Sequence, residues 1–502
     1  MIVDDHIHAL PKGNRDDVLP ELLRQCRVNG VSVGLVSIGW KISPFPDEEE
    51  TRRSNEAALD FATRSGGLLK PLAYLNPQND NWREELDRCL DEGAVGIKLW
   101  TSLKEPDGKL DNAVKLLRHA GERCLAVLIH TWQVTWSPPS SQINVPEFAE
   151  LAERCPDTRL VAAHSGGNWR HSIGVLRDRL PNANLEVCGY YPEKGLVEAL
   201  AADVGAERVL FGSDLIGRSQ ASQMAKVVFA DIPEKDKELI LGGNAARLFG
   251  LEETPPPASE PLRPKEELPD FGEDHFCFCG DWPFHGGPWV RPDALDELLA
   301  EAGIETAYTG DFGGLYRQDL ERANNRFLAA ALKTSRVAPL ATLNPTAPNW
   351  PSVIRHLEDG FAGVILHPYL HNWRLDEEAH AAFFRTLSEA RLPVWINCAI
   401  ADHRTRHSGL ACRPVGGEEL TAFCQNAPSN DYVLQGVGGR QVSRMLGEHA
   451  GDASLRFEVS RLTDSSYDYG DVAAEHGLSH LVMGSEFPLR DLREVRWTAQ
   501  RV

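Results

Sequence analysis

The feature that most constrains this chain is the regular alternation of short apolar runs with amphipathic segments over its first half. Each apolar run has the length and composition of a buried strand, and each is followed by the 3.6-residue periodicity of a helix. We expect strands over residues 2–5, 31–38, 68–75, 95–99, 125–130, 160–164, 185–188 and 208–212. Eight strand–helix units in about 250 residues have the size and order of a (β/α)8 barrel of the TIM type, in the α/β class.

Two histidines close the first expected strand. His6 and His8 follow the acidic pair Asp4 and Asp5. Residues i and i+2 of an extended chain point to the same side, so the two imidazoles could hold one metal ion. Two surface histidines near a terminus would give the same pattern, so the pair alone leaves both interpretations open.

Further polar residues stand at the carboxyl ends of other expected strands, the face on which barrel enzymes carry their chemistry. They are Lys98 on the fourth strand, His130 on the fifth, His164 on the sixth and Asp214 after the eighth. A closed barrel places its first and last strands side by side, so His6, His8 and Asp214 can share one ion. Nitrogen and carboxylate ligands suit zinc, and also iron, manganese or cobalt. Taken singly, each of these residues could be a satisfied core residue.

These residues carry a family resemblance. The opening Asp-x-His-x-His, Lys98, His130, the His-Ser-Gly-Gly of 164–167, the Gly-Ser-Asp of 212–214 and the segment 243–251 resemble the amidohydrolase superfamily. The branch they resemble includes aminocarboxymuconate semialdehyde decarboxylase, and the resemblance covers residues 1–251. It implies His6, His8 and Asp214 as ligands of a divalent metal, zinc first, with His130 as a further ligand. One or two ions are expected.

The resemblance also implies catalytic roles. Asp214 would accept a proton from a metal-activated water, and His164 would act as a general base or as a ligand of a second ion. Lys98 would be carboxylated and bridge two ions, or bind substrate; a salt bridge at the barrel rim is the structural alternative. We expect hydrolysis of a C–N or C–O bond in a small cyclic or aromatic acid. The alternatives are non-oxidative decarboxylation on the same site and a non-catalytic metal-containing binding protein.

Aromatic and basic residues just beyond the strand ends could stack on and clamp a planar anionic substrate. They are Trp100, Trp132, Trp136, Trp169 and Arg170. Packing of these loop side chains on one another is the alternative.

The second half repeats the pattern of the first after a proline-rich linker. Leu75-Asn-Pro recurs as Leu343-Asn-Pro, and the Gly-Ser before Asp214 recurs before Glu486. In this alignment the chemical residues change: His6 becomes Cys277, His8 Cys279, Lys98 Ile365, His130 Asn397, His164 Gly436 and Asp214 Glu486. We therefore expect a tandem duplication: a working barrel over 1–253, a linker over 254–270 and a degenerate, pseudoenzyme barrel over 271–502. Cys277, Cys279 and Glu486, joined by His367, could bind a soft metal, or the cysteines could be apolar filler.

Composition limits the partners. A formal net charge of −21 argues against nucleic acid and anionic membranes, which require a basic face. No apolar run is long enough to span a bilayer, and a strand that begins at Ile2 leaves no room for a signal peptide. Ten scattered cysteines favour a cytoplasmic protein with reduced thiols. We expect a small-molecule substrate and two barrels packed as an intrachain pseudo-dimer, with further homo-oligomerisation left open.

Overall fold

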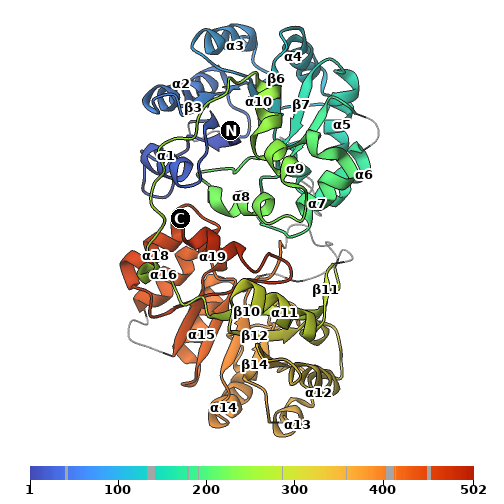
Figure 1. The fold of residues 1–502 in the computed structure, drawn as a ribbon, viewed down its shortest axis with the longest axis vertical. Coiled ribbons are helices and arrows are strands. Elements are labelled where there is room, and N and C mark those ends of the chain that lie inside the picture. The colour runs from blue at the N-terminus through green and yellow to red at the C-terminus, as the bar shows by residue number, and fades with distance from the viewer. Residues whose placement is uncertain are drawn as a thin grey trace. The chain divides into compact units, whose positions relative to one another are not determined.

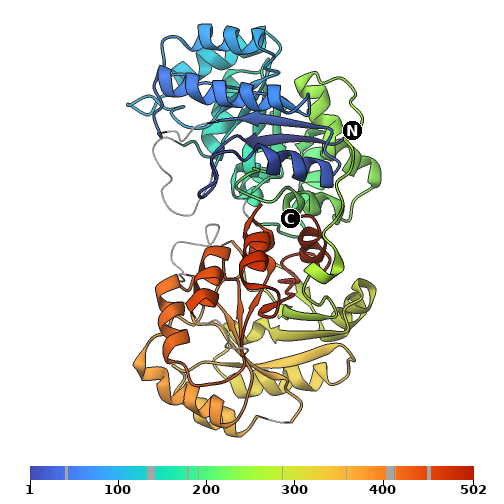
Figure 2. The same cartoon turned by 90° about the vertical axis from the view of Figure 1, so that its left-hand side faces the viewer.

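The computed structural model describes residues 1–39, 43–132, 142–177, 180–189, 191–284, 287–357, 359–402, 412, 414–448 and 454–502. The chain divides into two compact units, Met1–Leu262 with Arg501 and Arg263–Gln500 with Val502. In both views of the ribbon, each unit has helices outside its strands (Figures 1 and 2). The division lies within the segment 254–270, which the sequence predicts to be a linker.

The strands of the first unit form two parallel sheets. One has the order β1-β2-β3 and the other β4-β5-β6-β7-β8-β9. Their bounds are β1 Val3–His8, β2 Val33–Ser37, β3 Leu69–Pro71, β4 Ala73–Tyr74, β5 Ile97–Leu99, β6 Ala126–Ile129, β7 Arg159–Ala162, β8 Ala183–Glu186 and β9 Val209–Leu210. The single strand expected over 68–75 is β3 and β4, interrupted at Leu72. Leu72 N donates to Val36 O, whereas Ala73 N donates to Gly96 O, so the chain changes partner there.

The ring of strands closes through the segment after β9. Asp214 N donates to His6 O over 2.9 Å, and His8 N donates to Leu215 O over 2.6 Å. Asp5 N donates to Phe211 O over 3.1 Å. The last strand position therefore lies beside the first, as a (β/α)8 barrel requires.

Helices follow the strands in alternation. They are α1 Leu19–Val28, α2 Glu48–Arg64, α3 Trp82–Asp91, α4 Asp111–Glu122, α5 Val145–Arg154, α6 Trp169–Leu176, α7 Leu196–Leu200, α8 Gln220–Val228, α9 Glu234–Glu238 and α10 Asn244–Phe249. Capping boxes begin two of them, Asp47 with Glu50 at α2 and Asn144 with Glu147 at α5. Apolar residues of α10 pack with Val3, Val33 and Ala126, which lie at the amino ends of their strands. Because α10 covers the amino ends, the carboxyl ends are the side left for chemistry.

The second unit is a nine-stranded sheet in the order β11-β10-β12-β13-β14-β15-β16-β17-β18. Its strands are β10 Glu273–Asp281, β11 Trp289–Val290, β12 Thr306–Asp311, β13 Val337–Leu343, β14 Gly363–Leu366, β15 Val394–Asn397, β16 Tyr432–Gln435, β17 Leu455–Glu458 and β18 Leu481–Val482. Only β11 is antiparallel to its neighbour. The helices are α11 Pro292–Ala302, α12 Leu320–Ala331, α13 Trp350–Arg355, α14 Ala381–Glu389, α15 Gly417–Asn426, α16 Gly439–Glu448, α17 Ser460–Thr463, α18 Asp468–His476 and α19 Glu494–Ala499.

The hydrogen bonds that close this second ring correct the sequence alignment by one residue. Glu486 N donates to Phe276 O and Phe278 N to Phe487 O, as Asp214 N donates to His6 O and His8 N to Leu215 O. The counterparts of His6 and His8 are therefore Phe276 and Phe278, and the assignment to Cys277 and Cys279 is wrong. Both cysteines instead share an apolar cluster with side chains of α11. Cys277 and Cys279 have the same spacing as His6 and His8, which suggested the alignment. The direction in which a side chain points depends instead on the register of the strand.

None of the described helices is long and apolar enough to cross a lipid bilayer. All ten cysteines lie in the described part of the chain, and none of them forms a disulfide bond.

Candidate metal centre

Three predicted ligands meet at the carboxyl end of β1. His6 Nε2 lies 3.1 Å from His8 Nε2, and His8 Nε2 lies 3.3 Å from Asp214 Oδ1. His6 Nε2 is 4.0 Å from the same oxygen, and the three ligand atoms all lie within 4.8 Å of one another. Asp214 reaches this place from the loop after β9, where its φ is 61°. The geometry thus brings together one set of two imidazole nitrogens and one carboxylate oxygen.

The hydrogen bonds behind these atoms fit a cation site. His6 Nδ1 lies 3.1 Å from each carboxylate oxygen of Glu186, and His8 Nδ1 lies 3.4 Å from Ser37 O. Partners that accept a hydrogen bond place the proton of each imidazole on Nδ1 and leave the Nε2 lone pair free. The two Nε2 lone pairs and the Asp214 carboxylate repel one another unless a positive charge lies among them. A divalent ion bound by two nitrogens and one oxygen would remove this repulsion.

Lys98 supplies a positive group at the same place. Its Nζ lies 2.7 Å from His6 Nε2, and the side chain is buried on β5. Burial lowers the pKa of Lys98, and the negative charge of Glu186 opposes that shift. Lys98 therefore points into the ligand set and is not a salt bridge at an exposed rim. A bound divalent ion would compete with this ammonium for the His6 lone pair.

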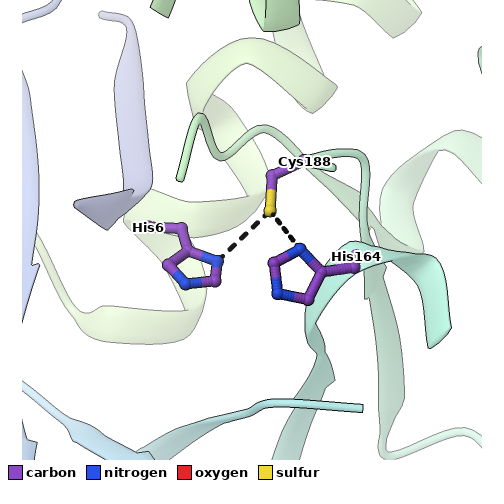
Figure 3. A group of neighbouring side chains, drawn as sticks. All are labelled: His6, His164 and Cys188. Atoms are coloured by element: carbon purple, nitrogen blue, oxygen red, sulfur yellow. Dashed lines mark hydrogen bonds between the residues drawn. The ribbon is translucent and has the colours of Figure 1, made fainter. Parts of the chain in front are cut away.

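A second cluster lies behind His6. Cys188 Sγ is 3.3 Å from His6 Nδ1 and 2.9 Å from His164 Nδ1, so the thiol stands between the two rings (Figure 3). These three ligand atoms also lie within 4.8 Å of one another. His164 does not end a strand as expected: β7 stops at Ala162, and His164 and Ser165 form a turn with φ of 60° and 45°. His164 Nε2 faces His130 Nδ1 at 3.2 Å.

His130 is thus placed against His164 and outside the group of three ligands. Its Nε2 is buried and has no hydrogen-bond partner in the described part of the chain. Burial lowers the pKa of His130 to about 3, and burial also holds the pKa of His164 well below its ordinary value. Both rings are therefore neutral near pH 7.

Buried carboxyl groups lie under the ligands. Burial raises the pKa of Asp4 to about 7, although Ser213 and Gln220 donate hydrogen bonds to it. Burial and then the charge of Glu186 raise the pKa of Asp5, whose two oxygens have no hydrogen-bond partner among the described residues. This concentration of acidic groups favours a cation nearby.

Two tryptophans flank the histidine pair. The ring of Trp132 stacks on His130 at 6.3 Å and meets His164 edge-on at 5.2 Å. Trp100 lies 6.3 Å from His130. Trp169 and Arg170, which were also expected to contact substrate, instead contact Glu193. Trp169 Nε1 and the Arg170 guanidinium both donate hydrogen bonds to its carboxylate. Trp136 lies outside the described residues.

Comparison with known proteins agrees with this arrangement. Residues 38–251 match the family model Amidohydro_2, described as amidohydrolase. The matched region covers most of the first unit and is similar to amidohydrolases. The match begins after β2, so the predicted ligands His6 and His8 precede it.

Solved structures similar to this chain include 2,6-dihydroxybenzoate decarboxylase from Rhizobium, with 19% identity and a TM-score of 0.40 over 50% of this chain and 98% of that one. Another is 4-oxalomesaconate hydratase from Rhodopseudomonas palustris, with 16% identity and a TM-score of 0.39 over 50% of this chain and 96% of that one. No curated protein matches the sequence. Scores at this level do not by themselves establish a shared activity.

Sequence reasoning missed two residues of this candidate site, Glu186 and Cys188. Both lie in the seventh expected strand, residues 185–188, in which no candidate residue was predicted. An ionisable residue inside a buried strand was the available signal. A second signal was the recurrence of this glutamate in the second half, where Leu185-Glu-Val-Cys corresponds to Phe457-Glu-Val-Ser.

The corresponding place in the second unit holds a different set of contacts. The rings of Phe276 and Phe278 take the ligand positions and lie 5.6 Å apart. Glu486 Oε1 accepts hydrogen bonds from Ala401 N at 2.6 Å and from Arg461 at 3.2 Å. Both groups of described side chains that could hold a metal lie in the first unit. The soft-metal site considered for Cys277, Cys279 and Glu486 is therefore not formed by these residues.

Proposed function

We propose that the first unit is a metal-dependent enzyme that hydrolyses a C–N or C–O bond of a small cyclic or aromatic acid. The observation that carries the proposal is the convergence of His6 Nε2, His8 Nε2 and Asp214 Oδ1 at the carboxyl ends of the strands. Two imidazoles and one carboxylate are the ligand set of catalytic zinc sites, which keep a further position open for water or substrate. We therefore favour one zinc ion.

A divalent ion held here would polarise a substrate oxygen and make a water molecule easier to deprotonate. Asp214 accepts the proton of the attacking water and returns it to the leaving nitrogen or oxygen, so one C–O bond forms as the scissile bond breaks. The neutral ring of His164 donates an N–H to the carbonyl oxygen on which charge develops. The Lys98 ammonium attracts the carboxylate of the substrate, and Trp132 and Trp100 provide flat surfaces for a ring.

Decarboxylation on the same site is the second candidate, and the two tryptophans favour it. A planar aromatic acid stacked between them would bring a ring carbon close to His164. His164 would then relay a proton from a water molecule to that carbon, the electron pair of the broken C–C bond would form the new C–H bond, and the hydroxide left behind would take up the released CO2 as bicarbonate. A non-catalytic metal-binding protein would have the same ligands and turn over nothing.

The metal site is tested by elemental analysis of the full-length wild type and of His6→Ala/His8→Ala. We expect the double variant to lose its metal and its activity, because both removed nitrogens belong to one ligand set. His119→Ala is the control, since His119 lies on α4 against Trp82. Equal metal content in the wild type and the double variant would contradict the assignment.

The reaction is tested by two substrate panels. Aromatic carboxylic acids are assayed for released CO2, and lactones and cyclic amides for released acid. Acid release that depends on metal supports hydrolysis, and CO2 release supports the second candidate. Purified metal-loaded protein that turns over neither panel would favour the binding protein.

A further inference from the structure

Glu186, at the end of β8, is the buried charged residue most closely tied to the ligand His6. We propose that Glu186 is a positioning residue with two roles. It holds His6 in the tautomer and orientation needed to bind metal, and it anchors the turn at His164 through hydrogen bonds to that turn. This inference rests on the metal site of the proposed function and adds a residue outside the ligand set.

The contacts of Glu186 are those of a two-sided clamp. Its Oε1 and Oε2 each lie 3.1 Å from His6 Nδ1, and both side chains are fully buried. Oε2 also accepts a hydrogen bond from His164 N over 3.2 Å. The backbone oxygen of Glu186 accepts from Ser165 Oγ over 2.7 Å. One residue thus holds a metal ligand with its side chain and the neighbouring turn with both side chain and backbone.

The carboxylate decides which nitrogen of His6 is free. A neutral imidazole carries one proton, and a carboxylate beside Nδ1 keeps that proton on Nδ1. Nε2 then presents its lone pair toward His8 and Asp214. Cys188 Sγ is also near His6 Nδ1, at 3.3 Å, but sulfur is a weak acceptor, and this thiol lies closer to His164 Nδ1.

The turn that Glu186 fastens needs such support. His164 and Ser165 are consecutive non-glycine residues with positive φ, a conformation that is unfavourable for residues with a side chain. The hydrogen bonds from His164 N and Ser165 Oγ to Glu186 hold this conformation. Removal of the Glu186 carboxylate therefore frees both His6 and the backbone of His164.

The second unit contains a natural control for this role. Glu458 occupies the corresponding position at the end of β17 and is fully buried. It accepts from Gly436 N over 2.6 Å, Ser460 N over 2.8 Å and Ser460 Oγ over 2.9 Å. The counterpart of His6 there is Phe276, which offers no nitrogen. Glu458 thus keeps the backbone role of Glu186 without a ligand to orient.

The experiment measures zinc affinity of full-length apo protein by competition with a chromophoric chelator, in the wild type, Glu186→Leu, Glu186→Gln and the control Glu458→Leu. Circular dichroism establishes that each variant is folded. We expect Glu186→Leu to bind zinc about 10- to 100-fold more weakly, the range found when such supporting partners of a ligand are removed. Glu186→Gln keeps one acceptor oxygen without the negative charge, and its zinc affinity should fall several-fold. Glu458→Leu should keep wild-type affinity while its thermal stability falls.

Each outcome decides the proposal. Zinc affinity in Glu186→Leu within twofold of the wild type would overturn it, as would an equal loss of affinity in Glu458→Leu, which would indicate general destabilisation. If Glu186→Leu does not fold, Glu186→Gln decides, and wild-type affinity there would contradict the role. A wild type that binds no zinc would instead refute the metal site itself, so the two failures are distinct.

Discussion

At the residue scale, Asp214 has the most specific role, because it is both a ligand and the proposed proton acceptor. Asp214→Asn keeps the shape of the side chain but removes its basicity. We expect turnover by metal-loaded enzyme to fall by about a hundredfold or more, since general bases contribute on that order. Steady-state rates with metal content measured in parallel test this. Glu486→Gln, at the corresponding place in the second unit, should leave the rate unchanged; a near-normal rate in Asp214→Asn with metal bound would refute the mechanism.

Glu458 predicts a pH dependence of stability in the second unit. Burial raises its pKa from the ordinary 4.5 to about 7. The folded state therefore keeps this proton up to about pH 7, whereas the unfolded chain releases it near 4.5. Its stabilising contribution is complete below pH 4.5 and is lost as the pH rises through 7, by at most about 3 kcal/mol.

The matched variant Glu458→Gln has no such proton to lose. Unfolding followed at pH 5 and pH 8 should show a larger decrease for the wild type than for Glu458→Gln. Equal decreases for the two proteins would show that this carboxyl is ionised in the folded state at both pH values.

At the element scale, one asparagine on α2 joins that helix to the divided strand. Asn55 Nδ2 donates to Tyr74 O over 2.9 Å, and Tyr74 N donates to Asn55 Oδ1 over 2.7 Å. Asn324 on α12 makes the same pair of bonds with Thr342 in the second unit. In both units a helix side chain thus completes the hydrogen bonding of a strand residue.

Asn55→Ala should therefore destabilise the first unit by about 2–4 kcal/mol, because it leaves a buried N–H and a buried C=O unpaired. Urea unfolding measures the change. Asn324→Ala should show a similar loss in the second unit, and the exposed Asn426→Ala should change little. A loss below about 1 kcal/mol in Asn55→Ala would mean that water satisfies the two backbone groups.

At the scale of the whole molecule, the two units close their rings with corresponding hydrogen bonds, whereas only the first holds a metal-binding group among its described residues. That the second unit is a degenerate copy, and that the two pack as a pseudo-dimer, stays a prediction. Duplicated domains commonly retain the contact of an ancestral symmetric dimer. Residues 1–262 expressed alone should then self-associate or aggregate and lose activity. Light scattering after size-exclusion chromatography tests this, and a monomeric, fully active fragment would contradict it.

The apolar periodicity of the sequence was sufficient to predict the order of strands and helices. It also predicted that the candidate site lies at the carboxyl ends of the strands. Parallel strands place their carboxyl ends at one edge, so His6, His8 and Asp214 could be brought together from their positions at strand ends alone. The split of the third strand at Leu72 could not be foreseen, because it depends on hydrogen bonds to two different neighbours.

Only the tertiary structure decided what each polar side chain faces. The bond from Glu186 to His6 joins residues 180 positions apart, and the placement of His130 against His164 depends on a turn of positive φ that no periodicity encodes. The register of β10 likewise put Phe276, and not Cys277, at the place of His6. Periodicity in a sequence reports which residues are buried. The direction of a buried side chain is set by ring closure and strand register, which are properties of contacts distant in the chain.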